Sequence, residues 1–367
     1  GGIGLFRGSS PQVWFGNAYS NTGLNYVRYD LELGDDVDWR TLPFEPNGLD
    51  QTRPTGAGAG GEMNVNFVGP DFEQPSVWKA NLAIDHELPW YGLVASAELL
   101  ATQVKSALFY RSINIGESVF KGPDGRDMYY DPARIGRSWT SGSNRYRRNT
   151  DFGQVFFLDN TDKGESQQFT LSLEKPWSPD GHWSWNVGYT FTNSNSVSDM
   201  TSSTAGSTWN YNYIFNANED VASTSRYEIR DRFSASLNWR HNFFGDYKTS
   251  VGVFYEGRTG RPFSYVFTND ANGDGRSGND LFYVPNAPGD VLFGSLSSSG
   301  VFTPDPAMEN RFFEWLEQNQ DLQRYRGGHV DKNGGRASWV NSFDIRVSQE
   351  LPGFFNGHKS EIWLDIQ

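Results

Sequence analysis

One short stretch carries side chains in a spacing suited to binding a metal ion. It reads Asp270-Ala271-Asn272-Gly273-Asp274-Gly275, and Asp280 follows. Oxygen-bearing side chains at positions one, three and five, followed by glycine, match the start of an EF-hand calcium loop. Arg276 could add its backbone carbonyl at position seven, whereas position twelve, usually acidic, is Leu281. We predict that Asp270, Asn272, Asp274 and Asp280 bind Ca²⁺. The alternative is a loop of Asx turns without an ion.

Other patterns that could suggest chemistry are weaker. The glycine-rich run 55–61 is not followed by Lys-Ser or Lys-Thr, so it is no phosphate-binding loop. The chain has no Cys, which excludes a thiol nucleophile. Several carboxylates and arginines fall on polar positions of alternating segments: Glu98, Asp344, Glu350, Asp365, Arg240, Arg258 and Arg346. We therefore expect no enzyme activity and no organic cofactor. A net charge of -13 argues against a nucleic-acid partner.

Alternation of apolar and polar residues is the main structural signal. It runs through segments 78–85, 168–174, 183–192, 233–240 and 343–348. Successive side chains of a strand point to opposite faces, so each segment has one apolar and one polar face. Aromatic residues make up 16% of the chain, yet mean hydropathy is -0.62. Apolar residues spread in alternation along a polar chain are typical of a membrane β-barrel. The alternative is a soluble antiparallel sheet with one solvated face.

The expected orientation of the strand side chains follows from this alternation. We predict that one set faces lipid: Phe169, Leu171, Trp183, Trp185, Leu237 and Val251. A second set should face the lumen: Ser172, Asn186, Ser236 and Glu256.

The connections between the segments alternate between short and long. Short turns are predicted at 88–92, 176–181, 242–246 and 352–357, and long loops at about 8–75, 111–150, 195–225 and 259–335. Outer-membrane barrels have short periplasmic turns and long extracellular loops. Aromatic residues accompany the short turns, where an interfacial girdle is expected. His86, His182, His241 and His358 fall at the same level, and we interpret them as interfacial packing rather than metal ligands.

Asn160 to Gly164 resembles a hairpin turn. Treating it as a bulge within one long strand over 152–175 preserves the short and long alternation everywhere. The predicted strands are then 2–7, 76–88, 91–110, 152–175, 182–194, 225–241, 246–258, 335–350 and 358–367. An open sheet with two free edges is not viable in lipid. We therefore expect the chain to be an internal part of a longer protein that supplies the remaining strands.

Several of these stretches resemble the barrel of TonB-dependent receptors of the Oar-like branch. The stretches that carry the resemblance are Gly2 to Gly8 with Pro11, Trp14 and Asn21-Thr22-Gly23, then Asn160 to Glu165 with Phe169 to Leu173, Gly188 to Thr192, Gly257 to Tyr265, Asp270 to Gly275, and Asn279 to Pro285. The resemblance runs over most of the chain. It implies an all-β fold, a transmembrane antiparallel β-barrel that belongs to a large, plugged barrel of 22 strands, in the bacterial outer membrane.

The same resemblance implies a function and partners. The function is TonB-dependent transport of a large substrate, such as a peptide, protein, glycan or metal chelate. Residues 1–367 would form one part of the barrel, with the plug and the last strand outside this chain. Expected partners are outer-membrane lipid, the TonB complex through regions outside this chain, the transported substrate, and a surface lipoprotein or another outer-membrane protein. Two alternatives stay open: an adhesion protein whose loops bind a partner, and a soluble glycan-binding or glycan-cleaving protein.

Overall fold

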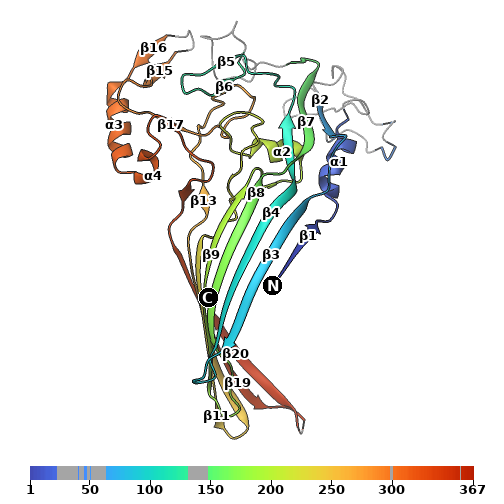
Figure 1. Ribbon diagram of the computed structural model, residues 1–367, viewed down its shortest axis with the longest axis vertical. Coiled ribbons are helices and arrows are strands. Elements are labelled where there is room, and N and C mark those ends of the chain that lie inside the picture. The colour runs from blue at the N-terminus through green and yellow to red at the C-terminus, as the bar shows by residue number, and fades with distance from the viewer. Residues whose placement is uncertain are drawn as a thin grey trace.

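A twisted antiparallel sheet dominates the computed structural model (Figure 1). The structure describes residues 1–22, 40, 45–47, 50, 63–130, 148–297, 301–355 and 357–367. The glycine-rich run 55–61 lies outside the described residues. Along the sheet the strand order is β1-β3-β4-β8-β9-β11-β12-β19-β20, so each strand pairs with its neighbours in sequence. The predicted all-β, antiparallel fold is confirmed.

The strands of this path agree closely with the alternating segments. They are β1 (Gly2–Arg7), β3 (Ser76–Glu87), β4 (Val94–Ser112), β8 (Gly164–Lys175), β9 (Trp183–Ser196), β11 (Asp231–Phe244), β12 (Tyr247–Arg258), β19 (Val340–Pro352) and β20 (Lys359–Ile366).

Three predicted strand starts were too early. β4 begins at Val94 rather than 91, because Tyr91 and Gly92 both adopt φ 60° in the turn. β11 begins at Asp231 rather than 225, because the segment before it folds into a turn in which Glu228 N–H donates to Ser225 O at 3.0 Å. β19 begins at Val340 rather than 335. The earlier residues, Gly335–Arg336 (β18), pair instead with Pro262–Phe263 (β13).

The single long strand predicted over 152–175 is confirmed. Phe152–Thr161 (β7) and Gly164–Lys175 (β8) both pair with β4. Ala107 pairs with Thr161 and Gln103 with Glu165, so the register is the same on both sides of the interruption. The expected bulge is therefore wrong in detail, because no extra residue is inserted. The strand is interrupted at 162–163, directly before Gly164, which has φ 134°.

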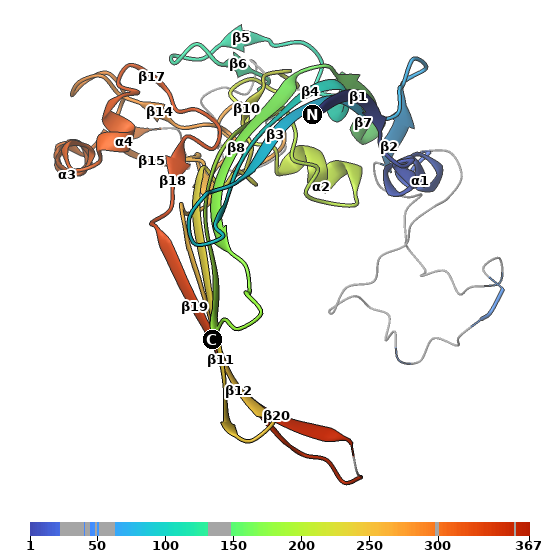
Figure 2. The same ribbon diagram turned by 60° about the horizontal axis from the view of Figure 1, so that its bottom comes forward.

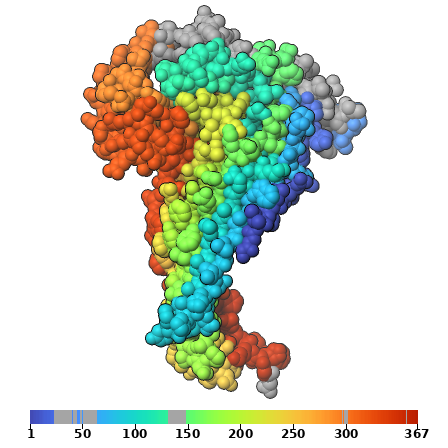
Figure 3. All heavy atoms as spheres, viewed as in Figure 1, coloured from blue at the N-terminus to red at the C-terminus, as the bar shows by residue number. Residues whose placement is uncertain are grey.

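The turns and the long connections lie at opposite ends of the molecule (Figures 1 and 3). Hairpin turns at the narrow end join β3 to β4, β8 to β9, β11 to β12 and β19 to β20. The described parts of the other connections gather at the broad end, as the predicted alternation requires. They contain α1 (Gln12–Ser20), β2 (Met63–Val68), β5 (Phe120–Lys121), β6 (Asp127–Met128), α2 (Ala205–Asn210), β10 (Ser223–Thr224), β14 (Tyr283–Val284), β15 (Gly294–Leu296), β16 (Phe302–Pro304), α3 (Pro306–Glu317), α4 (Gln320–Gln323) and β17 (Gly328–His329).

The described parts of the long connections contain two hydrophobic cores. Figure 2 shows the helices and short strands of these connections at the end of the sheet opposite the hairpin of β19 and β20. The first packs Leu108 and Tyr110 of β4 and Phe156 and Leu158 of β7 against Trp209 of α2. The second joins Leu281 and Val284 to Leu316 of α3, Leu322 of α4 and Val330. We call the folded connections at the broad end the cap. No helix among the described residues is long and apolar enough to cross a membrane.

Candidate functional site

The strand register places the apolar positions of all nine strands on one face. Leu82 pairs with Leu99, Leu99 with Phe169, and Leu171 with Tyr189. Trp185 pairs with Leu237, and Val251 with Val347. The two end strands join the same face, since Leu5 of β1 pairs with Trp78 and Leu364 of β20 pairs with Val347. Many of these side chains are exposed: Leu82 is 67% accessible and Phe343 59%. Such a wide exposed apolar surface marks contact with a partner or a membrane.

The opposite face is polar over the same height. Ser172 pairs with Gly188, Asn186 with Ser236, and Ser234 with Glu256. The predicted division of side chains into two sets on opposite faces is thereby confirmed by the pairing. Which set contacts lipid stays a prediction at this point.

Charged groups on the polar face pair with one another across strands. The Arg346 guanidinium donates to both carboxylate oxygens of Asp365, at 2.6 and 2.7 Å. Glu350 of β19 accepts from Lys359 of β20 at 2.7 Å. Glu256 of β12 pairs with Arg232 of β11, and within its own strand with Arg258 at 2.9 Å. Most of the carboxylates and arginines that the sequence placed on this face thus have ion-pair partners.

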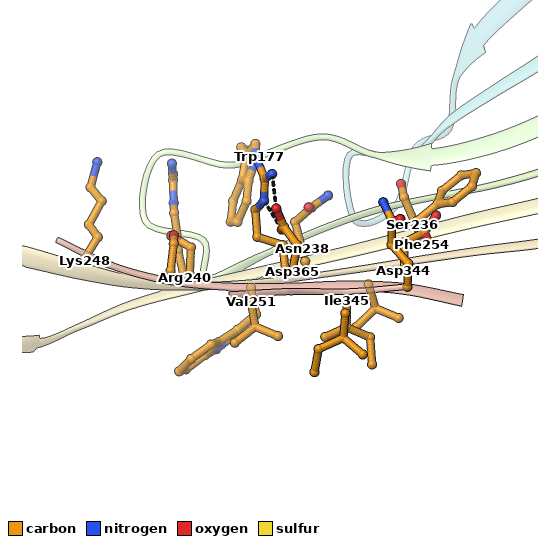
Figure 4. A pocket seen from close by; sticks show the side chains of 18 residues that line it. Trp177, Ser236, Asn238, Arg240, Lys248, Val251, Phe254, Asp344, Ile345 and Asp365 are labelled. Carbon is orange, nitrogen blue, oxygen red and sulfur yellow. Dashed lines mark hydrogen bonds and ion pairs between the residues drawn. The ribbon is translucent and has the colours of Figure 1, made fainter. Parts of the chain in front are cut away.

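A groove of about 730 Å³ runs along this polar face near the turns. Figure 4 shows Lys248, Arg240, Asn238 and Asp365 on one side of the sheet and Val251 and Ile345 on the other. Trp177, from the turn between β8 and β9, folds over this face with its ring 4.0 Å from the Arg240 guanidinium. Among the charged side chains that line the groove, Arg346 and Asp365 form an ion pair.

Aromatic rings concentrate at two heights of the apolar face. Near the turns, Trp239, His241 and Phe243 contact one another along β11. Near the cap, Phe233 lies 4.7 Å from Tyr189 and 6.1 Å from Trp339. Phe233 and Phe243 belong to the same strand, ten residues apart. At about 3.4 Å per residue and a tilt of about 40°, the two aromatic levels are about 26 Å apart.

The histidines near the turns take part in ring contacts. His182 and His241 lie 5.1 Å apart, and His358 lies 5.8 Å from Phe355. His182 Nδ1 is 2.9 Å from the carbonyl oxygen of Arg240. These contacts agree with interfacial packing for three of the four histidines.

The four predicted calcium ligands come together inside the cap. Asp270 accepts from Gly273 N–H at 2.7 Å and from Gly275 N–H at 3.0 Å. Asn272 Oδ1 accepts from Asp274 N–H at 2.8 Å, and Asp274 Oδ1 accepts from Arg276 N–H at 2.8 Å. Asp280 Oδ2 accepts from Ala271 N–H at 2.8 Å. Gly275 has φ 93°, the left-handed conformation that the motif predicted for position six.

This cluster is deeply buried. Asn272 and Asp280 are fully inaccessible, and Asp274 is 2% accessible. Burial raises the pKa of Asp274 well above its ordinary value, and the charges of Asp270 and Asp280 raise it further. Burial also raises the pKa of Asp280 to about 7, although Ala271 N–H and Arg126 oppose the shift.

Two features of the cluster were not predicted from the sequence. Asn279 is fully buried, and its Nδ2 donates to Asp274 Oδ2 at 3.3 Å. Arg126, 2% accessible, reaches in from the β4–β7 connection and lies 3.4 Å from Asp280 Oδ1. Neither contact is indicated by the sequence. Asn279 occupies no ligand position of the calcium motif, and Arg126 is more than 140 residues away from it.

Acidic, His and Cys side chains alone form no metal-binding group within the described part of the chain. An ion bound in this cluster would therefore also need amide or backbone oxygens, which Ca²⁺ accepts. The calcium site stays a prediction.

Comparisons with known proteins give a limited result. No protein-family model matches the chain. No curated protein matches it either. Among solved structures, the outer membrane transporter YddB from Escherichia coli is similar, with a TM-score of 0.37 and 10% sequence identity. The match covers 78% of this chain and 28% of the transporter, so the chain spans less than a third of that protein. A likeness this weak decides nothing about function, and the resemblance to Oar-like receptors stays a prediction.

Proposed function

We propose that this chain forms part of a transmembrane β-barrel in the bacterial outer membrane. The observation that carries the proposal is the mainly apolar face that runs across nine strands, with a polar face behind it. In a soluble protein an apolar surface of this width would be covered by a second layer. In an outer-membrane barrel the outward face is apolar and the inward face is polar.

The dimensions of the sheet support the same conclusion. Two aromatic levels about 26 Å apart agree with the apolar band of about 25 Å between the girdles of such barrels. Within the described residues, β1 pairs only with β3 and β20 only with β19. Free strand edges leave backbone N–H and C=O groups unpaired, which is too costly in lipid. Further strands of the same protein therefore complete the barrel.

We further propose that the barrel is an Oar-like, TonB-dependent transporter of a large substrate. The sequence resemblance supports this part, and the paired charges of the polar face suit a hydrated interior that a plug domain fills. Energy would come from the TonB complex, bound through regions outside this chain. An outer-membrane lipoprotein that presents substrate at the cap is a further proposed partner.

One observation favours a second candidate, a barrel whose outer end binds a partner without transport. The described part of the cap is folded around two hydrophobic cores, and a surface with a defined fold is suited to binding. The two candidates differ in their need for energy.

The test is the binding of the native outer-membrane protein to the purified periplasmic domain of TonB. A transporter should co-purify with that domain and should lose the interaction when the segment before its plug is deleted. An adhesion barrel should be found in the same membrane fraction and should not bind the domain. A protein found in the soluble fraction would contradict both candidates.

A further inference from the structure

A cavity of about 310 Å³ lies between two connections of the cap. The residues that line it come from the β9–β11 connection and from the β12–β19 connection. Val197 follows the last residue of β9 directly, and Ser223 begins β10, which pairs with the end of β9. The cavity therefore lies where the sheet meets the cap. Small-molecule sites have volumes of about 300–1,000 Å³, so this cavity has room for one small ligand.

Hydrogen bonds between the two connections hold the walls of this cavity in place. The Lys332 side chain is 5% accessible, and its ammonium donates to Asn212 Oδ1 at 2.7 Å. Asp199 Oδ2 lies 3.8 Å from the same ammonium. Leu281 N–H donates to Ile214 O at 2.9 Å. The cavity is therefore formed before a ligand arrives, which lowers the entropic cost of binding.

Two amides that line the cavity offer N–H donors. Asn212 Oδ1 accepts from the Lys332 ammonium, and Asn216 Oδ1 accepts from Asp127 N–H at 2.8 Å. These donors fix which end of each amide carries the oxygen. Within the described part of the chain, neither Nδ2 group has a hydrogen-bond acceptor. Both amides can therefore donate to a ligand.

Two carboxylates that line the cavity offer acceptors. Glu219 Oε1 accepts from Phe215 N–H at 2.6 Å, and Asp331 Oδ2 accepts from the Tyr325 hydroxyl at 2.9 Å. The second oxygen of each carboxylate accepts from no donor among the residues that the structure describes. Donors and acceptors thus lie around one cavity. A hydroxyl group donates one hydrogen bond and accepts two, so it can satisfy both kinds of partner.

The charged side chains of the lining have opposite charges nearby. Burial lowers the pKa of the Lys332 ammonium, and the negative charge of Glu219 opposes that shift. Arg324 and Asp331 both contact the Tyr325 hydroxyl, at 2.8 and 2.9 Å. These neighbours reduce the need for a charged ligand, so the cavity favours a neutral one.

The remaining wall of the cavity is apolar and partly flat. Val197, Ile214 and Leu281 are buried there. The His329 ring stacks on Phe215, with 4.0 Å between the ring centroids and 16° between the ring planes. His329 itself is exposed, so Phe215 covers one face of its ring and the other face stays accessible. A flat ring of this kind can pack against the C–H groups of a sugar.

We propose that this cavity binds one neutral sugar residue of a glycan, whose hydroxyls contact the two amides and the two carboxylates and whose apolar face packs on His329. A sugar suits the site better than a peptide, because it carries several hydroxyls around one compact ring. The inference rests on the proposed function in one respect, since it names a glycan as the substrate of the outer-membrane protein. The alternative is a cavity that holds only water.

The test is saturation-transfer difference NMR on the native protein in detergent, with glucose, galactose, mannose and N-acetylglucosamine as probes. We expect transfer to at least one of these sugars, with a Kd on the order of 10⁻³ M for a ligand of this size. Val221 lines the cavity and is 54% accessible, so Val221→Trp fills part of the space and should weaken binding by at least about tenfold. Val301→Trp is the matched control: this valine is also exposed in the cap, does not line the cavity and should leave binding unchanged.

A milder variant tests the polar contacts. Asp331→Asn keeps an oxygen for the Tyr325 hydroxyl and removes the charge, so it should weaken sugar binding by about threefold to tenfold. Two results would overturn the proposal: no transfer to any of the four sugars, or equal binding by the native protein, Val221→Trp and Asp331→Asn. Either would favour a cavity that holds only water. Sugar binding is measured without TonB, so this site and the proposed transport can fail separately.

Discussion

An arginine placed on the apolar face should destabilise the protein far more than an arginine placed at the neighbouring residue, which lies on the polar face. Leu237 lies on this face between Trp185 of β9 and Val253 of β12. It is six residues from Phe243, which belongs to the aromatic level near the turns. At about 3.4 Å per residue and a tilt of about 40°, Leu237 lies about 16 Å from that level, close to the middle of a band of about 25 Å.

An arginine at the middle of the bilayer costs about 2–4 kcal/mol on the lipid face of a barrel. We therefore expect Leu237→Arg to lower the free energy of unfolding by that amount. Ser236→Arg is the matched control, because Ser236 pairs with Asn186 on the polar face and an arginine there can reach water. Its expected effect is below about 1 kcal/mol.

The assay is reversible folding of the native protein into lipid vesicles, followed by denaturant titration of both variants. The difference between Leu237→Arg and Ser236→Arg is the decisive quantity. If the two variants lose the same stability, or if Ser236→Arg loses more, then the assignment of the apolar face to lipid is wrong.

Two further predictions concern the edges of the sheet and the cap. Residues 1–367 expressed alone should aggregate, because β1 and β20 each present an unpaired edge within the described sheet; a monodisperse monomer without detergent, seen by light scattering, would favour a soluble protein. Glu228→Gln should loosen the cap by about 2 kcal/mol, since the Glu228 carboxylate is buried, accepts from Ser194 N–H at 2.6 Å and pairs with Arg336. Hydrogen exchange should then rise near residues 194 and 223–230, whereas Glu317→Gln, which breaks a more exposed pair with Arg326, should have little effect.

The strands could be predicted from the sequence because their signal is local. Period-two alternation in five segments, together with the positions of the short turns and long loops, predicted all nine strands of the main path. The alternation of turns and loops also correctly favoured one long strand over a hairpin at residue 160. The starts at 225 and 335 were wrong because local hydrogen bonds and short pairings in the cap satisfy those backbones. The partners of residues 335–336 lie far away in sequence, and residues 225–230 form a turn. Alternation of apolar and polar residues carries no information about either kind of contact.

The cap could not be predicted, because its contacts join distant segments. Its first core packs residues near 110 and 156 against Trp209, and the acidic loop is held by residues 126–130. The calcium motif gave four side chains that the structure does bring together. It could not give Asn279 or Arg126, whose roles depend on how three connections meet.

The most direct test of the central claim is chemical labelling of single cysteines in native outer membranes. The 367 residues contain no Cys, so each introduced thiol reports without background from this region. Thiols at Leu171, Trp185 and Val251 should react with a lipid-soluble maleimide and resist a charged one. Thiols at Ser172, Asn186 and Glu256 should show the opposite preference. Equal reactivity of the two sets toward both reagents would contradict a sheet with one face in lipid and the other in water.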